Sequence, residues 1–103
     1  MKTIIILVLL ASLCGVASAQ GSAEDCKALI GLALQDTQIT SARVIPASGL
    51  VPEYCQVLGG VETVILFEVA LPTSTWNGRF FFAGGGGYNG NIPSLDHALA
   101  RGY

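Results

Sequence analysis

The sequence predicts an α/β fold to which this chain contributes a β-rich portion. Two runs rich in β-branched and apolar residues, 37–47 and 62–71, have the composition of strands. A third apolar run, residues 79–83, leads directly into four consecutive glycines and then into a short helical pattern. These runs account for the β-rich portion, and the α/β class follows from a resemblance described below.

The first 19 residues have the pattern of a secretory signal peptide. Lys2 precedes an apolar run over residues 4–13, and Ala17-Ser18-Ala19 supplies small residues for cleavage. We therefore expect a mature chain over residues 20–103, located outside the cell or in the periplasm. The apolar run is too short to cross a bilayer, so we expect no membrane span after cleavage.

Export would place the remaining cysteines in an oxidising compartment. Lipidation of Cys14 is disfavoured, because Leu13 is larger than the small residue that normally precedes a lipidated cysteine. The mature chain would keep Cys26 and Cys55, an even count that is most simply a disulfide. Half of a metal site is the weaker alternative, since His97 is the single histidine and no C-x-x-C pair occurs.

The composition excludes one class of partner. The formal net charge is −2 and no basic stripe occurs, so a nucleic-acid partner is not expected. Hydrophobic residues make up 51% of the sequence, and its long apolar runs need more covering than a chain of this length supplies. This argues mildly against an independent domain.

Two segments have helical patterns. In residues 24–34 the apolar positions fall near helical spacing and acidic residues stand at the N-terminal end, although Gly31 weakens the prediction. Residues 93–100 have the pattern of a helix start, with Asp96 near its positive end.

The strand predictions follow from β-branched content and alternation. We expect strands over residues 37–47, 54–59, 62–71 and 79–83. Within residues 62–71, one fully apolar face is formed by Ile65, Phe67, Val69 and Leu71. Asn77-Gly78 is a turn signal at the end of the connection that follows. Residues 79–83 are apolar on both faces, as expected for a strand buried in the middle of a sheet.

The five glycines between residues 84 and 90 allow several interpretations. A linker is disfavoured, because a structured segment follows directly. A dinucleotide fingerprint fits Gly85, Gly87 and Gly90, but the acidic residue expected about twenty positions later lies beyond the sequence. A P-loop would need lysine where Asn91 stands. An oxyanion-hole loop and a tight packing turn both remain compatible with the residues.

Several motifs occur in a fixed order after the leader. Cys26 comes first, Cys55 is followed by a strand, and the runs FEVALP, WNGR and GGGGYNG come next. Together, and at this spacing, they resemble the N-terminal part of the tannase and feruloyl esterase family. The resemblance spans almost all of residues 20–103, and the combination is much more specific than the glycine pattern alone.

The resemblance implies a secreted serine esterase with an α/β-hydrolase core and a large inserted lid. Such enzymes hydrolyse esters of phenolic or aromatic acids, such as galloyl and feruloyl esters, as small molecules or parts of plant polymers. The resemblance also implies that Cys26 and Cys55 pair. It implies no cofactor in this chain and places any structural calcium in the lid, outside this sequence.

One catalytic position carries over to this chain. Gly87, the last of the four consecutive glycines, matches the position whose N–H helps to form the oxyanion hole. The family's C-S-x-G-G nucleophile motif and the later triad residues are absent from this sequence, and Ser74, Ser94 and His97 stand in no such context. The signature at residues 76–79 suggests no chemistry, and a packed turn with a strand edge is the favoured interpretation.

We therefore interpret residues 20–103 as a truncated N-terminal part of an esterase catalytic domain, inactive by itself because it lacks the nucleophile. The alternative is a small secreted binding module that contains a disulfide and has no catalytic activity. In that alternative the glycine loop would be an adaptable contact surface.

Overall fold

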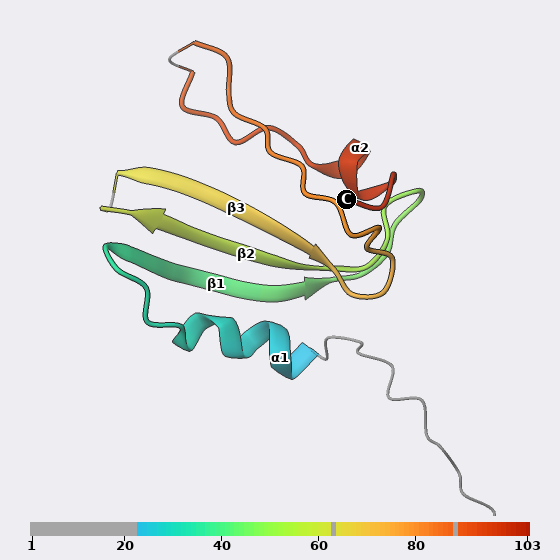
Figure 1. Cartoon of the computed structure of the whole chain (residues 1–103), viewed down its shortest axis with the longest axis horizontal. Helices are drawn as coiled ribbons and strands as arrows, with labels where there is room; N and C mark the ends of the chain where they lie inside the picture. The colour runs from blue at the N-terminus through green and yellow to red at the C-terminus, as the bar shows by residue number, and fades with distance from the viewer. Residues whose placement is uncertain (1–22, 63, 88) are drawn as a thin grey trace, which may run out of the picture.

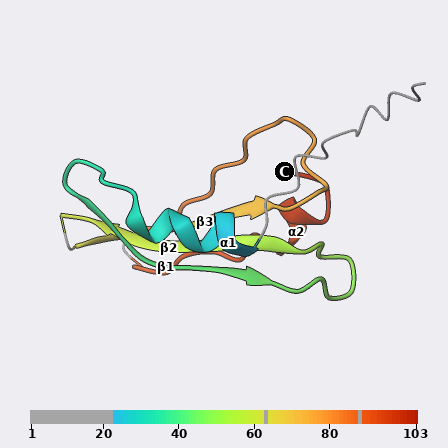
Figure 2. The same cartoon turned by 90° about the horizontal axis from the view of Figure 1, so that it is seen from below.

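The computed structural model describes residues 23–62, 64–87 and 89–103, and the leader predicted for residues 1–19 lies outside them. Figure 1 shows a twisted sheet with one helical segment below it and a long excursion of the chain along its other side. Seen from below in Figure 2, that helical segment, α1 (Ala23–Ala28), overlies β1 (Thr37–Ile45) and β2 (Tyr54–Val61). None of the helices in the described residues is long and apolar enough to cross a membrane.

Among the described residues, the sheet has three strands in the order β1-β2-β3, each antiparallel to the next. The strands are β1 (Thr37–Ile45), β2 (Tyr54–Val61) and β3 (Ile65–Pro72). These predictions are confirmed, with small differences at the ends. β3 begins later than predicted because the chain turns first: Glu62 has a φ of 49°, and the Val64 amide donates to the Val61 carbonyl at 3.2 Å.

The helix predicted for residues 24–34 is shorter than expected. α1 spans Ala23–Ala28, a 3₁₀ turn η1 continues over Leu29–Gly31, and Leu32 is already extended with a ψ of 124°. Gly31 explains the early end, because glycine loses more backbone entropy in a helix than any other residue. The predicted helical part after Gly31 is therefore wrong.

The core lies between α1 and the face of β1 and β2 that carries Cys55. Cys26 of α1 is joined to Cys55 of β2 by a disulfide with 5.7 Å between the Cα atoms. The buried residues of this core are Cys26, Ile39, Ala42, Cys55 and Val57. The predicted disulfide is therefore present in the structure, and it holds α1 against the middle strand.

The strand predicted for residues 79–83 is wrong. The segment pairs with no other strand among the described residues. A strand exists only where a neighbour takes up its backbone hydrogen bonds, and the free edge of β3 faces this segment across an open groove. Phe80 and Phe82 are 85% and 80% exposed, which is the opposite of the buried position expected.

The last helix, α2, covers Asp96–Leu99, so only the centre of the helix predicted for residues 93–100 forms. Leu99 is 2% exposed and anchors it beside the end of β3. The described residues thus form an antiparallel β-rich unit with short helices. This agrees with the β-rich portion that was predicted, while the complete α/β-hydrolase fold stays a prediction.

Candidate functional site

The glycine-rich segment is the tip of a long excursion between β3 and α2, residues 79–95. Figure 1 shows the chain leaving the end of β3, running back along its outer side and returning to α2. An open groove of about 740 Å³ separates the excursion from β3. Its walls are mainly apolar, with Leu66 on one side and Phe80 and Ile92 on the other.

The four consecutive glycines differ in what surrounds them. A Cβ added at Gly85 would clash with the Asn89 side chain and would lie 2.8 Å from the Asn91 carbonyl oxygen. A Cβ added at Gly84 or Gly86 would meet no atom within 4 Å. A side chain at residue 85 is therefore excluded by its neighbours, whereas residues 84 and 86 have open space.

Two further glycines are required by backbone conformation. Gly87 has a φ of 59° and Gly90 a φ of 65°. Both values lie in the left-handed region, which costs an L-residue roughly 1–2 kcal/mol. Glycine is therefore the residue that positions 87 and 90 require on conformational grounds.

Asn89 organises the loop in a way that sequence reasoning missed. Its Oδ1 accepts a hydrogen bond from the Asn91 amide at 3.0 Å, which closes a local turn. The same oxygen occupies the space above Gly85 that a Cβ would need. The signal was the Asn89-Gly90 pair, since an N-G dipeptide marks a turn.

The Gly87 amide is available to a ligand. No described residue accepts a hydrogen bond from it. With no side chain at residue 87 and open space around it, an oxygen atom can approach the N–H closely. Chemically, this arrangement can donate one hydrogen bond to a carbonyl oxygen or to the anion that develops from it.

The other candidate residues are not brought together. The Ser94 hydroxyl accepts from the Asp96 amide at 3.3 Å, and the His97 ring packs edge-on against Phe81 with centroids 5.3 Å apart. In the part of the chain that the structure describes, no hydrogen bond joins Ser74 or Ser94 to His97. His97 is exposed on α2.

No metal-ligand cluster is found in residues 23–62, 64–87 and 89–103. Within these ranges, no three or more His, Cys, Asp or Glu side chains lie together in a group that could hold a metal ion. The calcium that the resemblance assigns to the lid concerns residues outside this sequence and stays a prediction.

A row of polar side chains crosses the sheet on the face opposite α1. The Arg43 Nε donates to the Gln56 Oε1 at 3.3 Å, and the Gln56 Nε2 donates to the Glu68 Oε1 at 2.9 Å. Tyr54 lies on the same face of β2, because side chains alternate along a strand, and it is 9% exposed. Burial raises the pKa of the Tyr54 hydroxyl, and the negative charges of Glu68 and Asp96 raise it further.

The comparison with protein families shows to which family the chain belongs. The family model described as tannase and feruloyl esterase matches residues 47–103. The chain belongs to this family. The matched part of this tannase-family chain includes β2, β3, the glycine loop and α2.

Curated relatives of the tannase-family chain carry esterase or hydrolase names. An uncharacterized esterase of Agrobacterium fabrum is 38% identical over 88 residues, which is 77% of this chain and 16% of the relative. An uncharacterized esterase of Xanthomonas campestris pv. campestris is 30% identical over 115 residues, which is 96% of this chain and 20% of the relative. A mono(2-hydroxyethyl) terephthalate hydrolase of Piscinibacter sakaiensis is 31% identical over 71 residues, or 60% and 12%. The chain spans between 12% and 20% of these relatives' lengths, and no solved structure gives a significant match.

Proposed function

We propose that this chain is part of a carboxylic ester hydrolase and supplies one of its oxyanion donors, the Gly87 amide. One observation carries the proposal. Gly87 combines a φ of 59° with an amide that no described residue accepts from, inside the segment that matches the tannase and feruloyl esterase family.

The proposed chemistry is acyl transfer through a serine outside this sequence. The serine oxygen attacks the ester carbonyl carbon, and the carbonyl oxygen takes up the negative charge of the tetrahedral intermediate. The Gly87 N–H donates to that oxygen, the alcohol leaves, and water then hydrolyses the acyl-enzyme. One such donor lowers the barrier by about 3–4 kcal/mol. We propose an α/β-hydrolase fold for the complete protein, in which a glycine-rich loop supplies an oxyanion donor.

We further propose that the substrates are esters of aromatic acids. The family description names tannase and feruloyl esterase, whose substrates are galloyl and feruloyl esters. The Piscinibacter sakaiensis relative is named for a monoester of terephthalic acid, which is also an aromatic acid. The aromatic acyl group is the feature that these substrates share.

Secretion belongs to the same proposal. The disulfide between Cys26 and Cys55 supports it, because disulfides persist in oxidising compartments. If residues 1–19 are a cleaved leader, the exported protein begins at Gln20. Intact mass and N-terminal sequencing of the exported protein measure this directly, and a retained Met1 would contradict it.

The function is tested in the longest protein that the reading frame encodes around this chain. We expect it to hydrolyse methyl gallate, methyl ferulate or mono(2-hydroxyethyl) terephthalate faster than methyl cyclohexanecarboxylate, a non-aromatic control. A fluorophosphonate probe should label one serine in that protein and none in residues 20–103 alone. A protein that is soluble and folded but hydrolyses none of these esters would overturn the proposal and favour the binding module.

A further inference from the structure

Asn77 connects the two ends of the excursion that carries the glycine loop. Its backbone N–H donates to the Gly102 carbonyl at 2.7 Å. Its side-chain Nδ2 donates to the Arg101 carbonyl at 3.1 Å, and its Oδ1 accepts from the Arg79 amide at 2.9 Å. One residue therefore fixes the turn that opens the excursion and ties it to the turn that follows α2.

The neighbouring residues are shaped for the same closure. The Trp76 Nε1 donates to the Arg79 carbonyl at 2.9 Å, so Arg79 is held on both its backbone groups. Gly102 has a φ of 86°, and a Cβ there would lie 3.2 Å from the Thr75 carbonyl oxygen and 3.4 Å from the Asn77 Cβ. The two ends of the excursion thus lie too close together to leave room for a side chain at residue 102.

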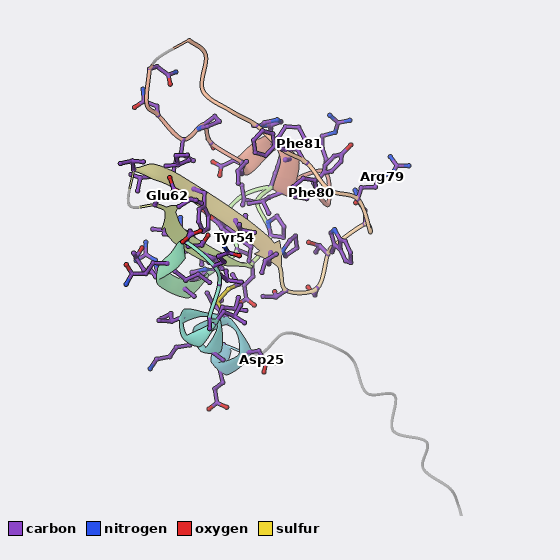
Figure 3. All side chains as sticks on the ribbon, turned by 60° about the vertical axis from the view of Figure 1, so that its left-hand side comes forward. Asp25, Tyr54, Glu62, Arg79, Phe80 and Phe81 are labelled. Carbon is purple, nitrogen blue, oxygen red and sulfur yellow. A yellow bond between two sulfur atoms is a disulfide. The ribbon has the colours of Figure 1, made fainter. Side chains whose placement is uncertain are left out.

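Aromatic packing continues the closure beyond these hydrogen bonds. Phe81 packs against His97 with ring centroids 5.3 Å apart and against Tyr103 at 5.6 Å. Figure 3 shows Phe81 beside α2, while the Arg79 side chain extends away from the sheet. Within the WNGR motif, the backbone of Arg79 therefore contributes to the closure and its charged group does not.

We propose that Asn77 is a positioning residue for the Gly87 amide, which it serves by closing the base of the excursion. The inference rests on the proposed oxyanion role of Gly87. A catalytic donor must be held within about 0.5 Å of its productive place, and a long segment with free ends cannot hold its tip so narrowly. Asparagine suits the position because one short side chain supplies both the acceptor for Arg79 and the donor for Arg101.

The test compares two variants with a control in the longest encoded protein. Asn77→Ala removes both side-chain hydrogen bonds. Asn77→Asp keeps the acceptor for the Arg79 amide but replaces the donor to the Arg101 carbonyl by an oxygen. Ser74→Ala is the control, because Ser74 lies in the same connection and its side chain makes none of these bonds. The readouts are amide hydrogen exchange and the separate values of kcat and KM for an aromatic ester.

For Asn77→Ala, we expect the Arg79 amide to exchange faster by on the order of tenfold, because it loses its acceptor. In Asn77→Asp, the Arg79 amide should stay protected. Both variants should lower kcat by about tenfold or more with little change in KM, because the donor acts mainly in the transition state. Ser74→Ala should change neither readout.

The outcomes separate this proposal from the proposed function. If the wild-type protein hydrolyses esters and Asn77→Ala keeps its kcat, the positioning role is overturned and the oxyanion role is untouched. If Asn77→Asp keeps full kcat while Asn77→Ala loses it, the link to Arg101 is overturned. Unchanged exchange at Arg79 in Asn77→Ala contradicts the local turn at residues 77–79 on which the closure is built, even in a protein without esterase activity.

Discussion

At the scale of single residues, the glycine run is a set of different requirements. Gly85 leaves space for the Asn89 side chain, and Gly87 supplies a positive φ. A Cβ added at Gly84 or Gly86 would meet no atom within 4 Å. The sequence shows four identical letters, and only the backbone conformation separates their roles. The substitutions below are chosen to separate these roles experimentally.

Gly87→Pro removes one oxyanion donor and also cannot adopt the φ of 59°, because proline fixes φ at about −65°. In the longest encoded protein, loss of the donor should lower kcat on the order of 10²–10³-fold, and the changed loop conformation should lower it further. KM should change much less, since the donor acts on charge that develops in the transition state. Because φ is 59°, Gly87→Ala is also strained and should lower both stability and kcat. Gly84→Ala is the matched control. A folded Gly87→Pro protein with near-normal kcat would reduce the loop to a packing turn.

Gly85→Ala should displace the Asn89 side chain and open the turn that it closes. The added methyl group would meet both the Asn89 side chain and the Asn91 carbonyl oxygen. The Asn91 amide, which donates to the Asn89 Oδ1, should then exchange faster by on the order of fivefold to tenfold. Gly84→Ala should leave this exchange unchanged, and equal rates in both variants would contradict the close approach.

At the scale of secondary-structure elements, the disulfide between α1 and β2 should carry a large part of local stability. The chain-entropy model gives about 3–4 kcal/mol for a closed loop of this length. For the Cys26→Ala/Cys55→Ala double variant, we expect the free energy of unfolding measured by urea denaturation to be lower by about that much. Intact mass after alkylation, with and without reductant, reports the bond directly. Two free thiols in the unreduced exported protein would contradict the prediction.

Tyr54 on β2 should make stability fall at alkaline pH. Its folded-state pKa is raised above the ordinary value of 10.0, first by burial and then by Glu68 and Asp96. A raised pKa contributes stability that is present below about pH 10 and lost as the pH rises through the folded value. The melting temperature should therefore fall more steeply as the pH rises above about 10 than it does in Tyr54→Phe, because the loss begins near the unfolded pKa and continues to the higher folded one. Parallel curves for the two proteins would contradict the expectation.

At the scale of the whole molecule, the sequence predicted the local elements better than their surroundings. The three antiparallel strands could be predicted from alternation and β-branched residues, because each strand pairs with the next one along the chain through a short connection. Residues 79–83 have a strand's composition but no pairing partner among the described residues, so composition alone gave a wrong prediction. Gly31 ended the helix early, where glycine's cost outweighed the apolar spacing.

The site was predictable only in part, and for a physical reason. Family resemblance suggested Gly87 as an oxyanion donor, which stays a prediction, while its positive φ became visible only in the structure. The hydrogen bonds of Asn77 to Arg101 and Gly102 join residues far apart in sequence, so no local pattern encodes them. Asn89 was visible only as a turn signal, because its contact with Gly85 depends on the folded path of the loop.

Residues 20–103 alone should self-associate. The face of β3 that was predicted to be fully apolar is not covered: Ile65 is 61% exposed and Val69 is 39% exposed. On the other face, Leu66 is 70% exposed. An unpaired strand edge beside apolar side chains favours association between copies. Analytical ultracentrifugation should show species larger than the monomer at micromolar concentration. Sharp, dispersed NMR spectra from a soluble monomer would contradict this and favour the binding module.

The consecutive pairing of β1, β2 and β3 has a consequence for the order of folding. Each strand pairs with the next along the chain, so the sheet forms from contacts of short sequence separation, which form fast. The bond between Cys26 and Cys55 also closes within this part of the chain. In the export that we propose, the chain would emerge from its N-terminus, so the sheet and its cross-link would be complete before the glycine loop appears and the loop would be added to a framework already fixed. Pulse-labelled hydrogen exchange should show β2 amides protected earlier than the amides of residues 79–95.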